Sequence, residues 1–163
     1  MTRFVGVTGH DLGAPRAHLE AVRRYDLDTV MFPVYPRVWG DSAYRADAEA
    51  LLEECAKRDV GVMVIKAVAR RPWGDRAVET TTWYEPVRDY PAIERGVRFA
   101  LSTPGVHAFC TPSSKEILPL AVQAAEEFQP LDETQRDHSV IEMETEPLIF
   151  PLRERAVPFI KRA

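Results

Sequence analysis

Short apolar runs alternate with segments of helical spacing along most of the chain. The apolar runs predict strands over residues 4–7, 28–34, 60–65 and 106–110. After each run, apolar residues recur at every third or fourth position, which predicts helices over residues 14–24, 42–57, 91–101 and 115–128. Strands that alternate with helices are typical of parallel sheets joined by right-handed crossovers. The pattern therefore predicts an α/β fold of four parallel strand–helix units.

Four units raise a difficulty, because a closed barrel of this kind needs eight. An open sheet of four strands would leave unpaired edges, which we expect at residues 4–7 and 106–110. Its inner face would expose apolar side chains such as Val5, Val7, Met31 and Val64. We therefore predict half of a TIM (β/α)8 barrel that pairs with a missing half or with itself. The alternative is a small doubly wound parallel sheet with its ligand at a switch point.

The two longest segments outside these units have different characters. Residues 66–89 form a long connection with little regular pattern, and such loops usually serve a function. Residues 132–163 mix charges with three prolines and the apolar patch Leu148-Ile149-Phe150. We therefore divide the chain into a partial barrel at residues 1–131 and a C-terminal extension at residues 132–163, which packs over the barrel end or frays.

Composition and charge mainly exclude classes of function. The 21 basic and 25 acidic residues are interspersed and give a net charge of −4, so we expect no nucleic-acid partner. The longest apolar stretch, residues 60–65, is too short to span a bilayer, and the start has no signal-peptide core, so we expect no membrane association and a cytoplasmic location. Cys55 and Cys110 lack a CxxC partner and are expected to be buried and reduced. The four histidines lack metal-binding spacing, so we expect no metal site.

Five segments resemble, in order, the second half of the aldo-keto reductase barrel. Gly6-Val7-Thr8-Gly9-His10 resembles the end of the family's fifth strand, and residues 29–36 resemble its sixth. Residues 61–67 resemble the seventh strand, and residues 97–106 resemble the approach to the eighth. Residues 121–128, with Pro130-Leu131, resemble the helix that closes the barrel. The resemblance covers residues 3–132.

This resemblance implies an oxidoreductase that reduces carbonyl compounds with NAD(P)H, the cofactor supplying the hydride and the protein positioning it. The family's catalytic tyrosine and its aspartate, lysine and histidine partners lie on the first four strands. The resemblance thus implies a fragment without the catalytic tetrad, to which no catalytic residue is assigned and which is inactive alone. A second reading is a non-catalytic nucleotide-binding or scaffolding half-barrel that dimerises.

The resemblance also implies where NADP(H) or NAD(H) would bind in the complete enzyme, beside a small carbonyl substrate. It places the nicotinamide at Thr8 and His10, and the pyrophosphate at Lys66 and at Arg70 and Arg71. It places the adenosine phosphates at a helix start formed by Ser113, Ser114 and Lys115. The arginines that hold the 2′-phosphate in many members are absent, which predicts weak discrimination between the two cofactors. The alternatives are a plain turn after the first strand, a solvated basic loop and an ordinary helix cap.

Trp73, Trp83 and Tyr84 lie in the long loop at residues 66–89. They either line a substrate pocket or anchor the loop on the barrel top, and the sequence does not separate the two.

Overall fold

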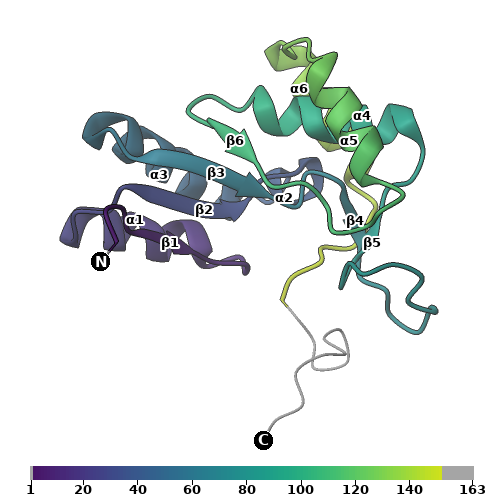
Figure 1. The fold of residues 1–163 in the computed structure, drawn as a ribbon, viewed down its shortest axis with the longest axis horizontal. Coiled ribbons are helices and arrows are strands. Elements are labelled where there is room, and N and C mark those ends of the chain that lie inside the picture. Colours follow the sequence, from purple (N-terminus) through teal and green to yellow (C-terminus); the bar gives the residue numbers. More distant parts are fainter. Residues whose placement is uncertain (1, 152–163) are drawn as a thin grey trace, which may run out of the picture.

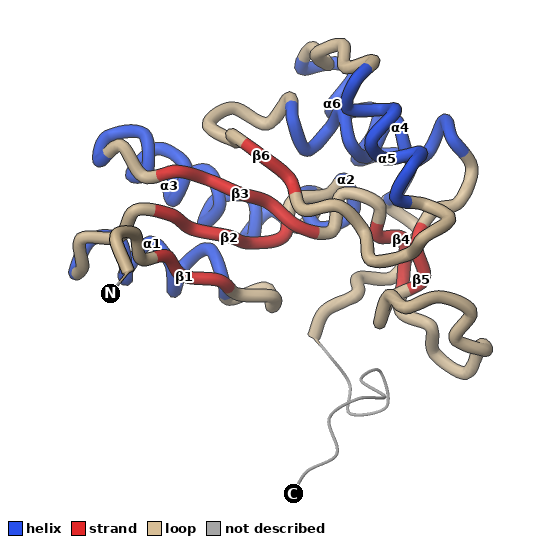
Figure 2. The backbone as a smooth tube through the Cα atoms, in the orientation of Figure 1, coloured by secondary structure: helices blue, strands red, loops and turns tan. Residues whose placement is uncertain are grey.

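The fold is described from a computed structural model, which describes residues 2–151. The elements run β1 (Gly6–Thr8), α1 (Ala14–Arg24), β2 (Thr29–Pro33), α2 (Pro36–Trp39), α3 (Ser42–Arg58), β3 (Gly61–Ile65), β4 (Ala69–Arg71), β5 (Glu85–Pro86), α4 (Tyr90–Leu101), β6 (Ala108–Phe109), α5 (Leu118–Glu126) and α6 (Glu133–Met143). Figures 1 and 2 show that strands and helices alternate as the sequence predicts.

A parallel sheet of four strands, in the order β1-β2-β3-β6, forms the centre of the molecule (Figure 1). Its register pairs Val7 with Val30, and Val30 with Val62. The predicted α/β class and the predicted edges at the first and last strands are confirmed. The strand order follows the chain order, as in a barrel, whereas a doubly wound sheet reverses its order at a switch point.

The two faces of this sheet differ in exposure. Val30, Phe32, Val62 and Val64 are almost completely buried, in one core with side chains of α1 and α3. On the other face Thr8, Met31, Met63 and Ala108 lie side by side in the register, and Met63 is 37% exposed. We call this row of four residues the open face.

One prediction about the open face was wrong. Val7 and Val64 were expected on it, but the register places Val7 beside Val30 and Val64 beside Phe32, in the rows that pack against the helices. Val64 is accordingly 0% exposed. Successive side chains of a strand point to opposite faces, so an error of one position reverses the assignment.

Aspartates begin three of the helices. Asp41, Asp89 and Asp132 precede α3, α4 and α6, and each side chain accepts a hydrogen bond from a main-chain N–H in the first turn. Asp132 also forms a capping box with Gln135. Such caps satisfy donors that have no partner within the helix.

Helix α6 lies in the segment where the sequence showed only a weak pattern. It packs against α2 and α4, and Ser139 is its one fully buried residue. Of the remaining extension, residues 144–151 are described, and Ile149 and Phe150 are buried in the main core, whereas residues 152–163 lie outside the described residues.

The long connection after β3 contains a short antiparallel hairpin, β4–β5. Helix α4 approaches this connection very closely at Gly96, where a Cβ atom would lie 2.2 Å from the carbonyl oxygen of Ala67. Glycine is therefore needed at position 96, because any side chain there would prevent the close approach of the α4 backbone to the backbone at Ala67.

Candidate functional site

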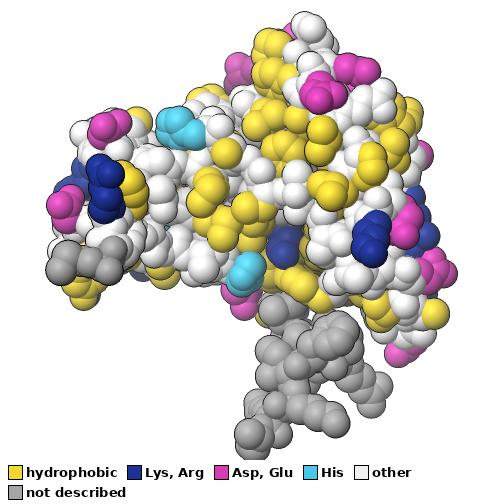
Figure 3. All heavy atoms as spheres, in the orientation of Figure 1, with side chains coloured by type: hydrophobic (Ala, Val, Ile, Leu, Met, Phe, Trp, Pro, Cys, Tyr) yellow, Lys and Arg dark blue, Asp and Glu magenta, His cyan; other side chains and the backbone are white. Residues whose placement is uncertain are grey.

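The carboxyl ends of the four parallel strands bring together residues from four separate segments. In barrels of this architecture this is the end that carries the active site. His10 follows β1, Met31 lies in β2, Lys66 follows β3 and Cys110 follows β6. The Cys110 Sγ atom lies 3.3 Å from the Met31 Sδ atom, and the charge of Lys66 lowers the pKa of His10. Figure 3 shows a face of the molecule on which hydrophobic side chains surround a histidine and a basic side chain.

Lys66 occupies an unusual position in this cluster. Its φ of 75° lies in the left-handed region, which residues other than glycine seldom adopt. The turn is closed by the Ala69 N–H, which donates to the Lys66 carbonyl oxygen at 2.8 Å. A residue held in a sparsely populated conformation at a strand end is a frequent mark of functional sites.

The Lys66 amine lies against aromatic rings. Its Nζ atom is 4.2 Å from the centre of the Trp83 ring and 5.0 Å from that of Tyr84. Within residues 2–151 no carboxylate pairs with this amine and no hydrogen bond reaches it. Burial lowers the pKa of Lys66 to about 8, and Cys110 acts weakly in the opposite direction. About a tenth of this amine is therefore neutral at pH 7.

The neighbouring His10 imidazole and Tyr84 phenol also favour their uncharged forms. Burial, and then the charge of Lys66, lower the pKa of His10, so its imidazole is neutral at neutral pH. Burial raises the pKa of Tyr84 and keeps its phenol protonated. Cys110 is exposed, which corrects the expectation that both thiols are buried, whereas Cys55 is buried as expected. Cys110 follows β6, the last strand of the sheet, and no further strand among residues 2–151 lies beyond it.

The aromatic residues of the long loop play two different roles. Trp73 is buried and donates its indole N–H to the Thr82 carbonyl oxygen at 2.9 Å, so it anchors the loop. Trp83 is half-buried and contacts Tyr84 and Phe150, at ring separations of 5.4 and 5.8 Å. Trp83 and Tyr84 thus form an aromatic wall beside Lys66, a role that the sequence did not distinguish from anchoring.

The arginines expected to bind pyrophosphate are paired with acids. Arg70 donates to Glu146 at 2.7 Å, and Arg71 makes two 2.9 Å contacts with Glu85. Glu146 also lies 3.6 Å from Arg71. A phosphate at Arg70 would have to displace Glu146.

The predicted helix start for adenosine phosphates differs from expectation. Helix α5 begins at Leu118 and not at Lys115, so Lys115 precedes the first turn. The Thr81 hydroxyl donates to the Ser113 carbonyl oxygen at 2.9 Å, and the buried Ser114 donates to Glu116 at 2.7 Å. That hydrogen bond lowers the pKa of Glu116 and keeps an anion beside the expected phosphate position. The acid at position 116, next to Lys115, is the sequence signal that argues against a phosphate site here.

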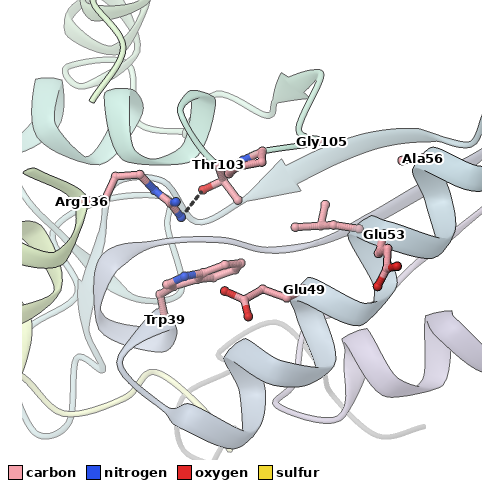
Figure 4. A pocket seen from close by; sticks show the side chains of 9 residues that line it. Trp39, Glu49, Glu53, Ala56, Thr103, Gly105 and Arg136 are labelled. Carbon is pink, nitrogen blue, oxygen red and sulfur yellow. Dashed lines mark hydrogen bonds between the residues drawn. The ribbon is translucent and has the colours of Figure 1, made fainter. Parts of the chain in front are cut away.

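A separate groove of about 340 Å³ lies between α3, the α4–β6 loop and α6. In Figure 4 the Arg136 guanidinium points towards Thr103, to which it donates at 3.4 Å, and lies near Trp39. The Arg136 Nε and Trp39 Nε1 atoms are buried without a hydrogen-bond partner among the described residues. Glu49 and Glu53 at the rim are each paired with a basic residue of their own helix. No pattern in the sequence predicted this groove.

The described residues contain neither a metal-binding cluster nor a membrane-spanning helix. Within residues 2–151 no three His, Cys, Asp or Glu side chains gather in a way that could hold a metal ion. No helix in the same range is both long and apolar enough to cross a membrane.

Comparison with known proteins supports the fold. No protein-family model matches the chain, and no curated protein matches it. Among solved structures, the chain is similar to the aldo-keto reductase AKR11C1 from Bacillus halodurans in its holo form, with a TM-score of 0.54 and 16% identity. The match covers 86% of this chain and 50% of that one, so the chain spans about half the length of that enzyme. The predicted fold, a parallel (β/α) fragment of a TIM barrel, is confirmed.

Proposed function

We propose that this chain is the cofactor-binding half of an NAD(P)H-dependent carbonyl reductase of the aldo-keto reductase type. The observation that carries the proposal is the likeness to half of such an enzyme, combined with Lys66 and His10 at the strand ends. We further propose that the protein acts in the cytoplasm on small carbonyl substrates.

In this proposal Thr8 and His10 hold the nicotinamide carboxamide. A neutral imidazole offers one donor and one acceptor, which match an amide. Lys66 supplies the positive charge for the pyrophosphate, because no carboxylate among residues 2–151 neutralises it. Arg70 contributes less to pyrophosphate binding in this proposal, because its guanidinium already binds Glu146.

We place the adenosine phosphates at Ser113, Ser114 and Lys115. The fit there is partial, because Glu116 puts a carboxylate beside Ser114 and opposes a 2′-phosphate. Lys115, which attracts a 2′-phosphate, and Glu116, which repels it, together support weak discrimination between NADPH and NADH. The cofactor, when bound, supplies the hydride, and the residues named here only bind and orient it.

The proposal assigns no catalytic acid to this chain, so carbonyl reduction requires a second half-barrel. The open face would be covered by that half or by a second copy of this chain. We therefore expect the purified chain alone not to consume NADPH in the presence of an aldehyde above background, since a missing general acid alone lowers rates by about 10²–10⁴-fold.

The test is a calorimetric titration of the chain with NADPH and with NADH, repeated on Lys66→Met and Lys115→Ala. We expect similar affinities for the two cofactors and a loss of about tenfold for Lys66→Met. Lys57→Ala is the matched control, because Lys57 is paired with Glu53 on α3, away from the strand ends. Absence of binding of either cofactor would overturn the cofactor-half proposal.

The open face supports a second candidate, a non-catalytic half-barrel that dimerises as a scaffold. Met63 is exposed at the centre of a sheet row that has no helix layer within the described residues. A stable dimer that binds neither cofactor would favour this candidate over the first.

A further inference from the structure

Lys66 combines three features that phosphate binding does not require. Its backbone is held at a φ of 75°, in the left-handed region, directly after β3. Its amine lies 4.2 Å from the Trp83 ring centre, in an apolar environment. Within residues 2–151 it has neither a carboxylate partner nor a hydrogen bond, in contrast to Lys57, which pairs with Glu53 at 2.8 Å.

We propose that Lys66 is a nucleophilic amine that condenses with small aldehydes and ketones to form an imine. This inference does not depend on cofactor binding. In the reaction the lone pair of the neutral amine forms a C–N bond to the carbonyl carbon, and the carbonyl oxygen takes up a proton. The nitrogen loses two protons in all and the oxygen gains a second one, the C–O bond breaks and one water leaves, so the C=N bond forms without an oxidant or a reductant.

The first requirement of this reaction is a neutral amine, because an ammonium has no lone pair. Burial lowers the pKa of Lys66 to about 8, from an ordinary value of 10.5. The neutral fraction at pH 7 is therefore raised by about 300-fold relative to an exposed lysine. The nearby aromatic rings attract the cation and limit this gain.

The second requirement is a group that can move protons between nitrogen and oxygen. The titratable groups that act on or contact Lys66 come from three different segments: His10 after β1, Tyr84 from the hairpin and Cys110 after β6. His10 is neutral at neutral pH and can accept a proton and return it. Tyr84 stays protonated and can donate a hydrogen bond to the carbonyl oxygen. A carboxylate, which would hold the amine in its charged form, is not among these groups.

The third requirement is access with room for a small organic group. Lys66 is half-buried, so part of the residue is exposed to solvent at the carboxyl end of β3. Trp83 and Tyr84 offer planar surfaces against which the planar imine and a short carbon chain can pack. The site therefore favours small apolar carbonyl compounds over charged ones.

The test uses the whole chain, acetaldehyde as the probe and sodium borohydride to trap the imine, followed by peptide mass spectrometry. The chain has four lysines, so each site is mapped separately in one sample. We expect Lys66 to be labelled at least tenfold faster than Lys57 and Lys115 at pH 7.5, with a pH midpoint near 8. The α-amino group, whose ordinary pKa is also near 8, serves as the chemical reference for an amine of that pKa.

Two variants separate the proposal from its competitors. Cys110→Ser should keep the labelling of Lys66, which shows that the thiol is not the primary nucleophile. Unfolding the protein in urea should abolish the preference for Lys66, which shows that the fold creates it. Labelling of Lys66 at or below the rate of Lys57 in the folded protein would overturn the proposal.

Discussion

Arg71 and Glu85 face each other across the β4–β5 hairpin and form an ion pair with two N–O distances of 2.9 Å. Arg76 adds a third contact to the same carboxylate at 2.7 Å. The Glu85 side chain is only 14% exposed, and its two arginine partners lower its pKa to about 2. This pair fixes the hairpin that carries Trp83 and Tyr84 towards Lys66.

Glu85→Gln should destabilise the protein by about 1–3 kcal/mol at pH 7, since charge-assisted hydrogen bonds to a partly buried group are lost. The pKa of Glu85 is lower in the folded than in the unfolded chain. Its contribution is therefore complete above about pH 4.5 and is lost as the pH falls towards 2. Urea unfolding should show the difference between wild type and variant shrinking over this range. Glu79→Gln, which breaks an exposed pair with Arg88, should change stability by less than about 0.5 kcal/mol.

Gly96→Ala should destabilise the protein by about 1–3 kcal/mol, because the new methyl group would collide with the Ala67 carbonyl oxygen. The direction of this change in stability is informative, because replacing glycine by alanine in a helix interior would otherwise stabilise the protein by up to about 1 kcal/mol. Thermal unfolding measures the change. Gly13→Ala is the matched control, because a Cβ there meets no atom within 4 Å. Equal melting temperatures for the two variants would contradict the close approach of α4 to the chain after β3.

The two cysteines should differ strongly in reactivity with a disulfide reagent. Cys110 is exposed and should react quickly in the folded protein. Cys55 is buried, and burial raises its pKa to about 11, so it should react only after unfolding. Absorbance titration should count one thiol in buffer and two in denaturant, and Cys110→Ser should remove the fast one. Two fast thiols in buffer would show that α3 does not protect Cys55.

The chain should self-associate at micromolar concentration through the open face. Met63→Glu places a charge at the centre of that face and should shift the protein towards monomer in sedimentation velocity. Ile141→Glu is the control, because Ile141 is 64% exposed on α6, on a helix remote from the open face. An equal effect of both substitutions would assign the association to general surface hydrophobicity.

The central part of the fold could be predicted from the sequence because local signals there are strong. Strand β3 is a continuous apolar run, and Asp41 begins α3 as its cap. The edge strands β1 and β6 are shorter than predicted, since each has one neighbour and fewer pairings. Helix α6 was missed because it buries little apolar surface and is defined by its capping box.

The site was predictable in outline but not in its pairings. The order of the strands places Lys66 and His10 at one end, as expected from the architecture. Arg70, however, pairs with Glu146, 76 positions away in the chain, and Arg71 pairs with Glu85 on the facing strand of the hairpin. No local pattern reveals such contacts, because they depend on how the hairpin and the segment after α6 pack together.

The sequential order of the sheet has a consequence for how the molecule folds. The β1–β2 pairing closes a loop that contains α1, and the β2–β3 pairing closes one that contains α2 and α3, whereas β3–β6 must close a loop that includes the hairpin and α4. Loop-closure entropy grows with length, so we expect β6 to dock last. Docking of β6 brings Cys110 next to Met31, so a fluorophore on Cys110 would report this step in stopped-flow refolding. A fluorescence change that coincides with helix formation would contradict the late docking of β6. The reactive end of the molecule is then assembled by the slowest contact of the chain, after the hydrophobic centre has already formed.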